Sequence, residues 1–109
     1  MRNLKKEEFD LIVAILKGED NADELIKELP YLIVEEMNDG GMGSLKFVSS
    51  TEKGFGKEIG EITLSDLDGV PVSFALNLDR EGKLYELDVF KADFSKLKKF
   101  PLLPYNLIE

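Results

Sequence analysis

The sequence predicts an α+β fold in which two N-terminal helices pack on one face of an antiparallel sheet of about five strands. Apolar residues near the N-terminus recur with helical spacing. From residue 31 onward, short runs of β-forming residues are separated by turn residues, and the last three strands are expected to form a meander. With 109 residues, the chain fits a single domain over residues 1–109.

The helices are predicted from spacing and from start and stop residues. One face of the first helix would carry Phe9, Ile12, Val13 and Leu16. Asn3 is expected to cap this helix and Gly18 to end it. A second, shorter helix is expected to start at residues 21–24 (Asn-Ala-Asp-Glu), which resemble a capping box, and to stop at Pro30.

The first strands of the sheet are expected over residues 31–34 and 45–48. Between them, residues 38–43 contain three glycines, which we interpret as a turn that uses positive φ. A phosphate-binding loop would need a helix to follow, and a strand follows here. Residues 49–56 are polar and glycine-bearing and predict a mobile loop.

The first hairpin of the meander is predicted at Asp66 and Gly69, whose spacing is typical of a type I turn with a glycine bulge. This turn sets Leu64 opposite Val72, so that apolar residues face each other.

The second hairpin has two candidate registers around residues 79–82 (Asp-Arg-Glu-Gly). The same type of turn would set Glu86 opposite Leu76. A four-residue loop over residues 79–82 instead sets Leu76 opposite Tyr85. Because a slip of one residue exchanges the two faces of a strand, the apolar match favours the second register.

This register divides the meander into two faces. The predicted core face carries Ile62, Leu64, Val72, Phe74, Leu76, Leu78, Tyr85, Leu87 and Val89. The opposite face mixes acidic, small and apolar residues: Ser73, Ala75, Asn77, Leu84, Glu86, Asp88 and Phe90. We interpret this mixture as a binding face, with Glu86 and Asp88 as its charges, Leu84 and Phe90 as apolar anchors, and Asn77 beside them.

Composition excludes several kinds of site. The chain has no Cys and no His, so thiol chemistry, zinc-thiolate sites and the most frequent general base are absent. The net charge of −8 disfavours nucleic acid and membrane partners. The sequence starts with charged residues and no apolar run, which predicts a cytoplasmic protein without a signal peptide. We expect no cofactor, no metal and no catalytic residue.

Three acidic motifs are candidate sites. Residues 77–88 resemble an EF-hand calcium loop, but both flanks are predicted strands, so a hairpin with a polar turn is favoured. Asp66 and Asp68 are interpreted as turn residues rather than metal ligands. Glu86 and Asp88 lie two apart on one strand, which permits an acid–base pair, yet an open face offers no desolvation to separate their pKa values.

Four segments carry a resemblance to a known family. They are residues 39–45 (DGGMGSL), 66–70 (DLDGV), 76–79 (LNLD) and 82–94 (GKLYELDVFKADF). Together they resemble a family of small bacterial proteins of unknown function, over most of the chain up to Pro101. The size and acidity of the chain are also similar to those of immunity proteins of bacterial toxin systems, which cover the basic active site of a toxin.

Two functions follow as hypotheses. The first is a non-catalytic acidic binding protein, immunity- or inhibitor-like, that engages a basic protein partner. The alternative is a small-ligand-binding protein or enzyme with a pocket between helices and sheet, for which Tyr85 and Asn77 are the polar candidates. The apolar tail over residues 100–109 is expected to pack on its own domain, and a homodimer through the tail is the alternative.

Overall fold

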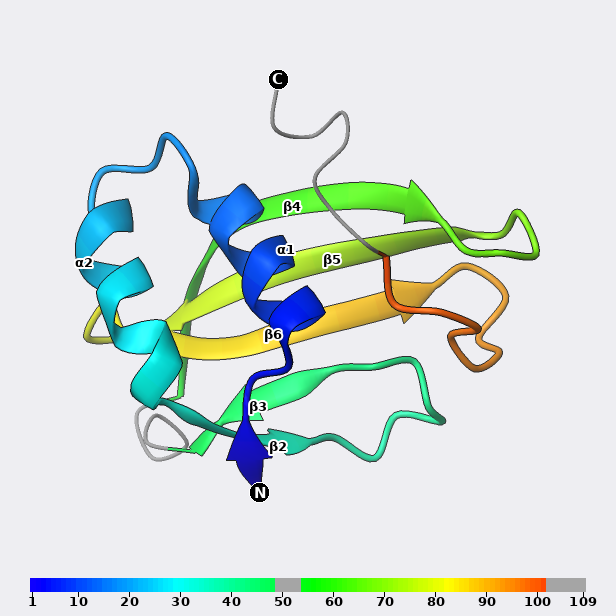
Figure 1. The fold of residues 1–109 in the computed structure, drawn as a ribbon, viewed down its shortest axis with the longest axis horizontal. Coiled ribbons are helices and arrows are strands. Elements are labelled where there is room, and N and C mark those ends of the chain that lie inside the picture. Colours follow the sequence, from blue (N-terminus) through cyan, green and yellow to red (C-terminus); the bar gives the residue numbers. More distant parts are fainter. Residues whose placement is uncertain (49–53, 102–109) are drawn as a thin grey trace.

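Two helices and a six-stranded antiparallel sheet form the chain in the computed structural model, which describes residues 1–48 and 54–101 (Figure 1). The elements are β1 (Arg2–Asn3), α1 (Lys6–Leu16), α2 (Ala22–Glu28), a 3₁₀ helix (Leu29–Tyr31), β2 (Ile33–Glu36), β3 (Leu45–Phe47), β4 (Phe55–Ser65), β5 (Pro71–Asp79) and β6 (Leu84–Lys91). The strand order is β1-β2-β3-β6-β5-β4. The α+β class and the antiparallel sheet are therefore confirmed, with six strands rather than about five.

The additional strand, β1, corrects the prediction for Asn3. This residue does not cap α1, because it pairs with Ile33 of β2 in the sheet, and its side chain donates to the Leu32 carbonyl oxygen at 3.3 Å. The helix starts three residues later, where the Lys5 N–H donates to Glu8 Oε1 at 2.8 Å. A two-residue strand is too short to show any periodicity in the sequence.

The connections follow the predicted pattern with small shifts. Gly18, with φ of +92°, lies just after the end of α1, as expected. The 3₁₀ helix that contains Pro30 moves the next strand from the predicted residues 31–34 to β2. Three glycines of the β2–β3 connection have positive φ, which confirms the turn interpretation. Of the predicted loop over residues 49–56, residues 49–53 lie outside the described part of the chain, and β4 already begins at Phe55.

The first hairpin of the meander has the predicted turn. The Asp66 N–H donates to the Val70 carbonyl oxygen at 3.0 Å, and the Gly69 N–H donates to the Asp66 carbonyl oxygen at 2.9 Å. Leu64 lies opposite Val72, as predicted.

The second hairpin corrects the preferred register. The turn is the type of the first hairpin and not the predicted four-residue loop, because the Asp79 N–H donates to the Lys83 carbonyl oxygen at 2.7 Å. A β-bulge at Tyr85 then shifts β6 by one residue, so that Leu76 lies opposite Leu87 instead of Glu86 or Tyr85. The bulge allows the chain to keep both the favourable turn and the apolar match, since one residue is left without a cross-strand partner.

The bulge also changes which residues reach the core. Leu84 is only 2% exposed and belongs to the hydrophobic core, so the prediction that it lies on the opposite face is wrong. Tyr85, expected in the core, is half-buried and lies outside the core cluster. The other predicted core residues of β5 and β6 are buried.

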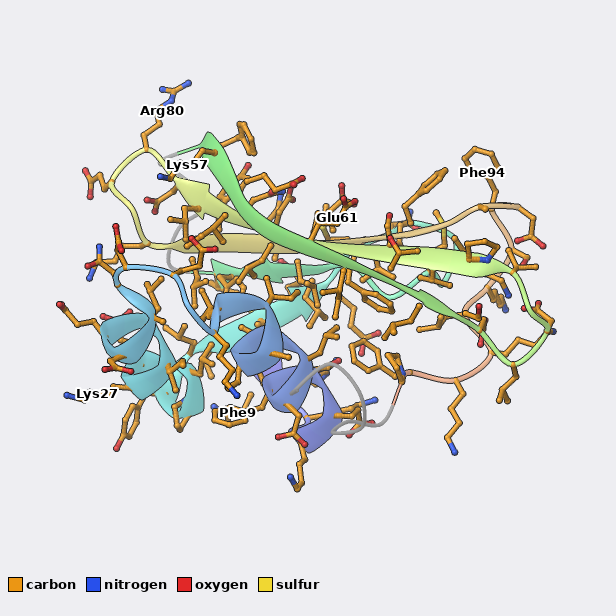
Figure 2. The ribbon with its side chains drawn as sticks, turned by 90° about the horizontal axis from the view of Figure 1, so that it is seen from above. Phe9, Lys27, Lys57, Glu61, Arg80 and Phe94 are labelled. Atoms are coloured by element: carbon orange, nitrogen blue, oxygen red, sulfur yellow. The ribbon has the colours of Figure 1, made fainter. Side chains whose placement is uncertain are left out.

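The helices cover one face of the sheet, as seen edge-on in Figure 2. The core lies between these two layers and includes Leu11, Ile12, Ile15 and Leu16 of α1. α1 approaches β4 closely at Gly60, where a Cβ would lie 2.8 Å from Cγ2 of Ile15. Within the described residues, no helix combines the length and apolar character needed to cross a membrane.

The bulge leads to a test by deletion. Removing Tyr85 would join Leu84 and Glu86 in a regular ladder without moving any other cross-strand pair. We expect this variant to fold and to unfold cooperatively, with a midpoint lowered by no more than about 10 °C in a thermal melt followed by circular dichroism.

Deleting Asp88 is the matched control. It would move Val89 to the wrong face and take Lys91 away from its buried position, so we expect no cooperative transition. Equal damage from both deletions would contradict the assigned bulge.

Candidate functional site

The face of the sheet opposite the helices, which we call the open face, is defined by residues that pair across the strands. Paired residues point to the same side of a sheet. Three rows of residues paired across neighbouring strands lie on the open face: Glu61–Ala75–Asp88, Thr63–Ser73–Phe90 and Glu58–Asn77–Glu86–Lys46–Glu35. Figure 2 shows Glu61 pointing away from the helices.

Small residues follow β5 through the centre of the open face, and acids stand on the strands at either side. Ala75 lies between Glu61 of β4 and Asp88 of β6. Because neighbouring strands are about 4.8 Å apart, the Cα atoms of Glu61 and Asp88 are separated by roughly 10 Å. The two carboxylates therefore stand on either side of the small Ala75.

Four of the five predicted site residues share this face. Asp88 and Phe90 are exposed, and Glu86 is half-buried. Asn77 is only 6% exposed, and its Nδ2 donates to Glu86 Oε1 at 3.2 Å, so it helps to position that carboxylate. The fifth, Leu84, belongs to the core because of the bulge at Tyr85.

An exposed aromatic pair lies at the end of β6. The rings of Phe90 and Phe94 meet edge to face, with centroids 5.1 Å apart, and the two residues are 43% and 68% exposed. Phe94 has φ of +64°, which is rare for a bulky residue, and it ends a turn in which its N–H donates to the Lys91 carbonyl oxygen at 2.9 Å. Figure 2 shows Phe94 on the same side of the sheet as Glu61.

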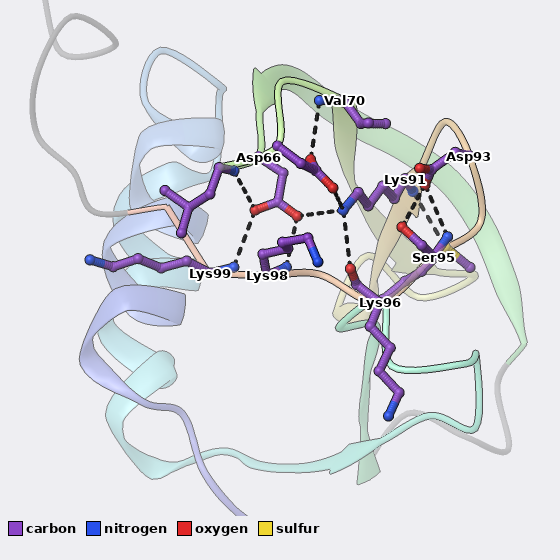
Figure 3. A network of polar contacts seen from close by, with 11 residues as sticks. Asp66, Val70, Lys91, Asp93, Ser95, Lys96, Lys98 and Lys99 are labelled. Carbon is purple, nitrogen blue, oxygen red and sulfur yellow. Dashed lines mark hydrogen bonds and ion pairs between the residues drawn. The ribbon is translucent and has the colours of Figure 1, made fainter.

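Behind this turn lies a buried ammonium group. Lys91 has no exposed surface, and its Nζ donates to Asp66 Oδ2 at 2.8 Å, to Asp68 Oδ2 at 2.7 Å and to the Lys96 carbonyl oxygen at 3.1 Å (Figure 3). An ammonium has three N–H groups, and all three have an acceptor here.

Asp66 forms hydrogen bonds with the backbone of the segment that follows β6. Besides Lys91 Nζ, its carboxylate accepts the backbone N–H groups of Leu67 at 2.7 Å, Lys98 at 2.7 Å and Lys99 at 3.2 Å (Figure 3). One buried carboxylate thus joins the β4–β5 turn, the end of β6 and the segment over residues 96–99.

The network fixes the charge states of its members. Burial alone would raise the pKa of Asp66, but the hydrogen bonds from Lys91 and the backbone outweigh it and hold the pKa well below its ordinary value. Burial alone would likewise lower the pKa of Lys91, and the hydrogen bonds to Asp66 and Asp68 raise it instead. Lys91 therefore keeps its proton and its positive charge inside the network.

Asp66 and Asp68 were also considered as possible metal ligands, and in the structure both bind Lys91. The cation between the two carboxylates is the Lys91 ammonium. In residues 1–48 and 54–101, no group of three or more acidic, His or Cys side chains is arranged to hold a metal ion.

The calcium-like segment over residues 77–88 is a hairpin between β5 and β6, as favoured from the sequence. The Asp79 carboxylate stabilises the turn of this hairpin, because its Oδ1 accepts the N–H groups of Glu81 at 2.8 Å and Lys83 at 3.0 Å.

Sequence reasoning missed Lys91 and Phe94. The signal for Lys91 was present, since Leu87, Val89 and Lys91 alternate on one side of a regular strand, which puts a lysine on the core face. No turn over residues 92–95 was predicted, although Asp93 Oδ1 accepts the Ser95 N–H at 3.0 Å, and Asp is a frequent turn residue.

A small hollow lies between the N-terminal end of α1 and the β2–β3 connection. It has a volume of about 200 Å³, and Arg2 is on its wall. The Arg2 guanidinium binds Glu8 at 2.8 and 2.9 Å and Glu36 at 3.1 and 3.2 Å. Burial would raise the pKa of Glu8, but the bonds from Arg2 and the Lys5 N–H lower it.

The chain belongs to the family described as "Domain of unknown function (DUF6984)", which matches residues 1–101. This finding confirms the resemblance to a family without an assigned function. Neither the curated proteins nor the solved structures contain a significant match to the chain.

The buried charges predict a pH profile of stability. Asp66 has a lowered pKa, so its contribution is present above the unfolded value of about 3.9 and is lost as the pH falls through that value toward the folded one. Lys91 has a raised pKa, so its contribution is present below about 10.4 and is lost above it. We expect thermal midpoints to be nearly constant from about pH 5 to 9 and to fall on both sides.

The variant Asp66→Asn isolates this group. We expect a lower midpoint at pH 7 and a shallower decline between pH 5 and 3, with about one proton fewer taken up on unfolding. Asp20→Asn, in the exposed connection between the helices, is the control and should keep the wild-type profile. An acid limb of wild-type steepness in Asp66→Asn would refute the assignment.

The backbone of Phe94 gives another prediction. Phe94→Ala and Phe94→Gly both remove the ring, but only glycine accepts a φ of +64° without cost. We therefore expect the Gly variant to be more stable than the Ala variant by about 1 kcal/mol in urea denaturation. An Ala variant as stable as the Gly variant would show that the positive φ is not imposed by the fold.

Proposed function

We propose that this protein is a non-catalytic acidic binding protein, immunity- or inhibitor-like, whose open face engages a basic protein partner. The observation that supports the proposal is the position of exposed acids on both strands beside β5, with an exposed aromatic pair at the end of the same face.

The charges of the open face are strongly one-sided. Its paired strand residues include the acids Glu35, Glu58, Glu61, Glu86 and Asp88, against the single base Lys46. Exposed ion pairs are worth only about 0.2–1 kcal/mol each, so these acids would mainly accelerate association and select a cationic partner. The same charge repels phosphate backbones and anionic headgroups, which argues against nucleic acid and membranes as partners.

The affinity would come from the aromatic pair. Buried aromatic side chains supply much of the energy of protein interfaces, and acids around them define orientation. Phe94 is 68% exposed and rests on Phe90, so most of its ring is available for a partner to cover. The hydrogen bond from the Phe94 N–H to the Lys91 carbonyl oxygen restrains the turn, and such restraint reduces the entropy lost on binding.

The immunity-like reading rests on size, acidity and this face together. An acidic face would meet the basic active site of a toxin by charge complementarity, and it needs no catalytic group of its own. Lys91 is fully buried and forms ion pairs with Asp66 and Asp68, so it does not contribute a reactive amine to the open face.

The alternative is a small-ligand-binding protein or enzyme with a pocket between helices and sheet. The hollow beside Arg2 is the observation that favours it, because α1 and the sheet both contribute to its wall. Its volume of about 200 Å³ is below the roughly 300–1,000 Å³ of most ligand sites, and Arg2 is already bound by two carboxylates. The open face therefore has the stronger support.

Charge reversal on the open face tests the proposal. We expect Glu86→Lys/Asp88→Lys to keep the wild-type circular dichroism spectrum and to bind a basic partner at least tenfold more weakly in titration calorimetry. Partners are first isolated by pull-down from lysate of the native source and then purified. Association with the wild type should slow markedly as salt is raised from about 50 to 300 mM.

The control variant Glu19→Lys/Asp20→Lys makes the same change of charge in the exposed connection between α1 and α2, and it should retain the partner. Because Glu86 is half-buried, Glu61→Lys/Asp88→Lys serves as a second test on two exposed acids. A partner that binds all three variants equally would exclude the open face as its site.

A further inference from the structure

The outer edge of β4 presents backbone groups to which another strand can bind. β4 is the last strand in the order β1-β2-β3-β6-β5-β4, and within residues 1–48 and 54–101 no strand pairs with its outer edge. Figure 1 shows β4 as the outermost strand on the side of the sheet away from β1. The strand is 11 residues long, and such an edge is a template for pairing with a further chain.

Only the second half of this edge is regular. The pairing of β4 with β5 shifts between Phe55 and Lys57 and again between Glu58 and Gly60. Irregularities of this kind twist a strand and discourage further pairing at a sheet edge. From Gly60 to Ser65 the pairing continues without a shift, so a further strand is expected along residues 61–65.

The hydrogen bonds of the first hairpin show which backbone groups of this half point outward. The Asp66 N–H donates to the Val70 carbonyl oxygen, which makes these two residues a hydrogen-bonded pair. In an antiparallel ladder, such pairs alternate with pairs that are not hydrogen-bonded. The even-numbered residues of this half therefore bond to β5, whereas the backbone N–H and C=O groups of Glu61, Thr63 and Ser65 point to the outer edge.

This edge is complementary to a second copy of itself in antiparallel orientation. With Thr63 of each copy at a two-fold axis, Glu61 lies opposite Ser65 of the second copy, so every outward-pointing residue has a partner and no two acids meet. On the side of the helices, Ile62 lies opposite Leu64 of the second copy. Both are only partly buried in one chain and pack against its core, so pairing would bury more of their apolar surface. An axis at Ile62 would instead place Ser65 against the irregular half of the strand.

We propose that residues 61–65 of β4 form a self-association site, at which two copies of this chain pair antiparallel about a two-fold axis at Thr63. The two six-stranded sheets then form one continuous sheet, with both open faces on the same side. This interface differs from a dimer through the C-terminal tail, of which residues 102–109 lie outside the described part of the chain.

The dimer is weak, because the paired segments are short and each copy carries a net charge of −8. Salt screens the repulsion between the copies and therefore strengthens this dimer, whereas it slows the association with a basic partner. The two associations are thus distinguished by the sign of their salt dependence.

Charges introduced at the two-fold axis test the pairing. Sedimentation velocity measures association from about 5 μM to about 1 mM protein in about 300 mM salt, and we expect a monomer–dimer equilibrium in the wild type. In Thr63→Lys and in Thr63→Glu, like charges lie directly opposite each other, so the dissociation constant should rise at least about tenfold in each variant. An equimolar mixture of these two variants sets opposite charges against each other and should restore the dimer.

Both variants should keep the wild-type circular dichroism spectrum, because Thr63 is exposed in the single chain. The control Glu19→Gln changes the net charge as Thr63→Lys does, but in the exposed connection between the helices, and it should dimerise like the wild type. A wild type that stays monomeric up to about 1 mM would overturn the proposal. A dimer retained by both variants would place the interface elsewhere, and a mixture that fails to dimerise would exclude a two-fold axis at this residue.

Discussion

The buried ammonium of Lys91 is the interaction on which the C-terminal third of this fold depends. A charge without solvent contact is stable only when it is fully paired, and here two carboxylates and a carbonyl oxygen surround it. Through Asp66, the same cluster holds the backbone of residues 98 and 99. The β4–β5 turn, the end of β6 and the following segment therefore form one unit.

This unit also shapes the surface that we propose for binding. The turn after Lys91 puts Phe94 in a left-handed conformation and sets its ring against Phe90, beside the acids of β6. A conformation that costs energy for a bulky residue persists only where the surroundings impose it, and the buried network is what surrounds this turn. The buried network around Lys91 and the exposed pair of Phe90 and Phe94 therefore both lie at the end of β6.

Features set by local chemistry were predictable from the sequence. The two helices and the turn at Asp66 and Gly69 follow from spacing and turn residues. The register of the second hairpin was not predictable in this way, because no regular ladder gives both the favourable turn and the apolar pairs, whereas the bulge at Tyr85 gives both. Of the candidate site, Glu86, Asp88 and Phe90 were found by alternation, whereas Leu84 was misplaced by that bulge. Phe94 lies in a turn closed by local hydrogen bonds, but a positive φ is rare for a bulky residue, so residue preferences gave no reason to expect it there.

Amide hydrogen exchange at Lys98 and Lys99 tests the central role of the network most directly. Both side chains are exposed and neither residue belongs to a helix or strand, so their amides would exchange quickly without a partner. Because both N–H groups donate to buried Asp66, we predict slow exchange in the wild type and a loss of protection in Lys91→Met, while the amides of α1 stay protected. Fast exchange at both residues in the wild type would contradict the account.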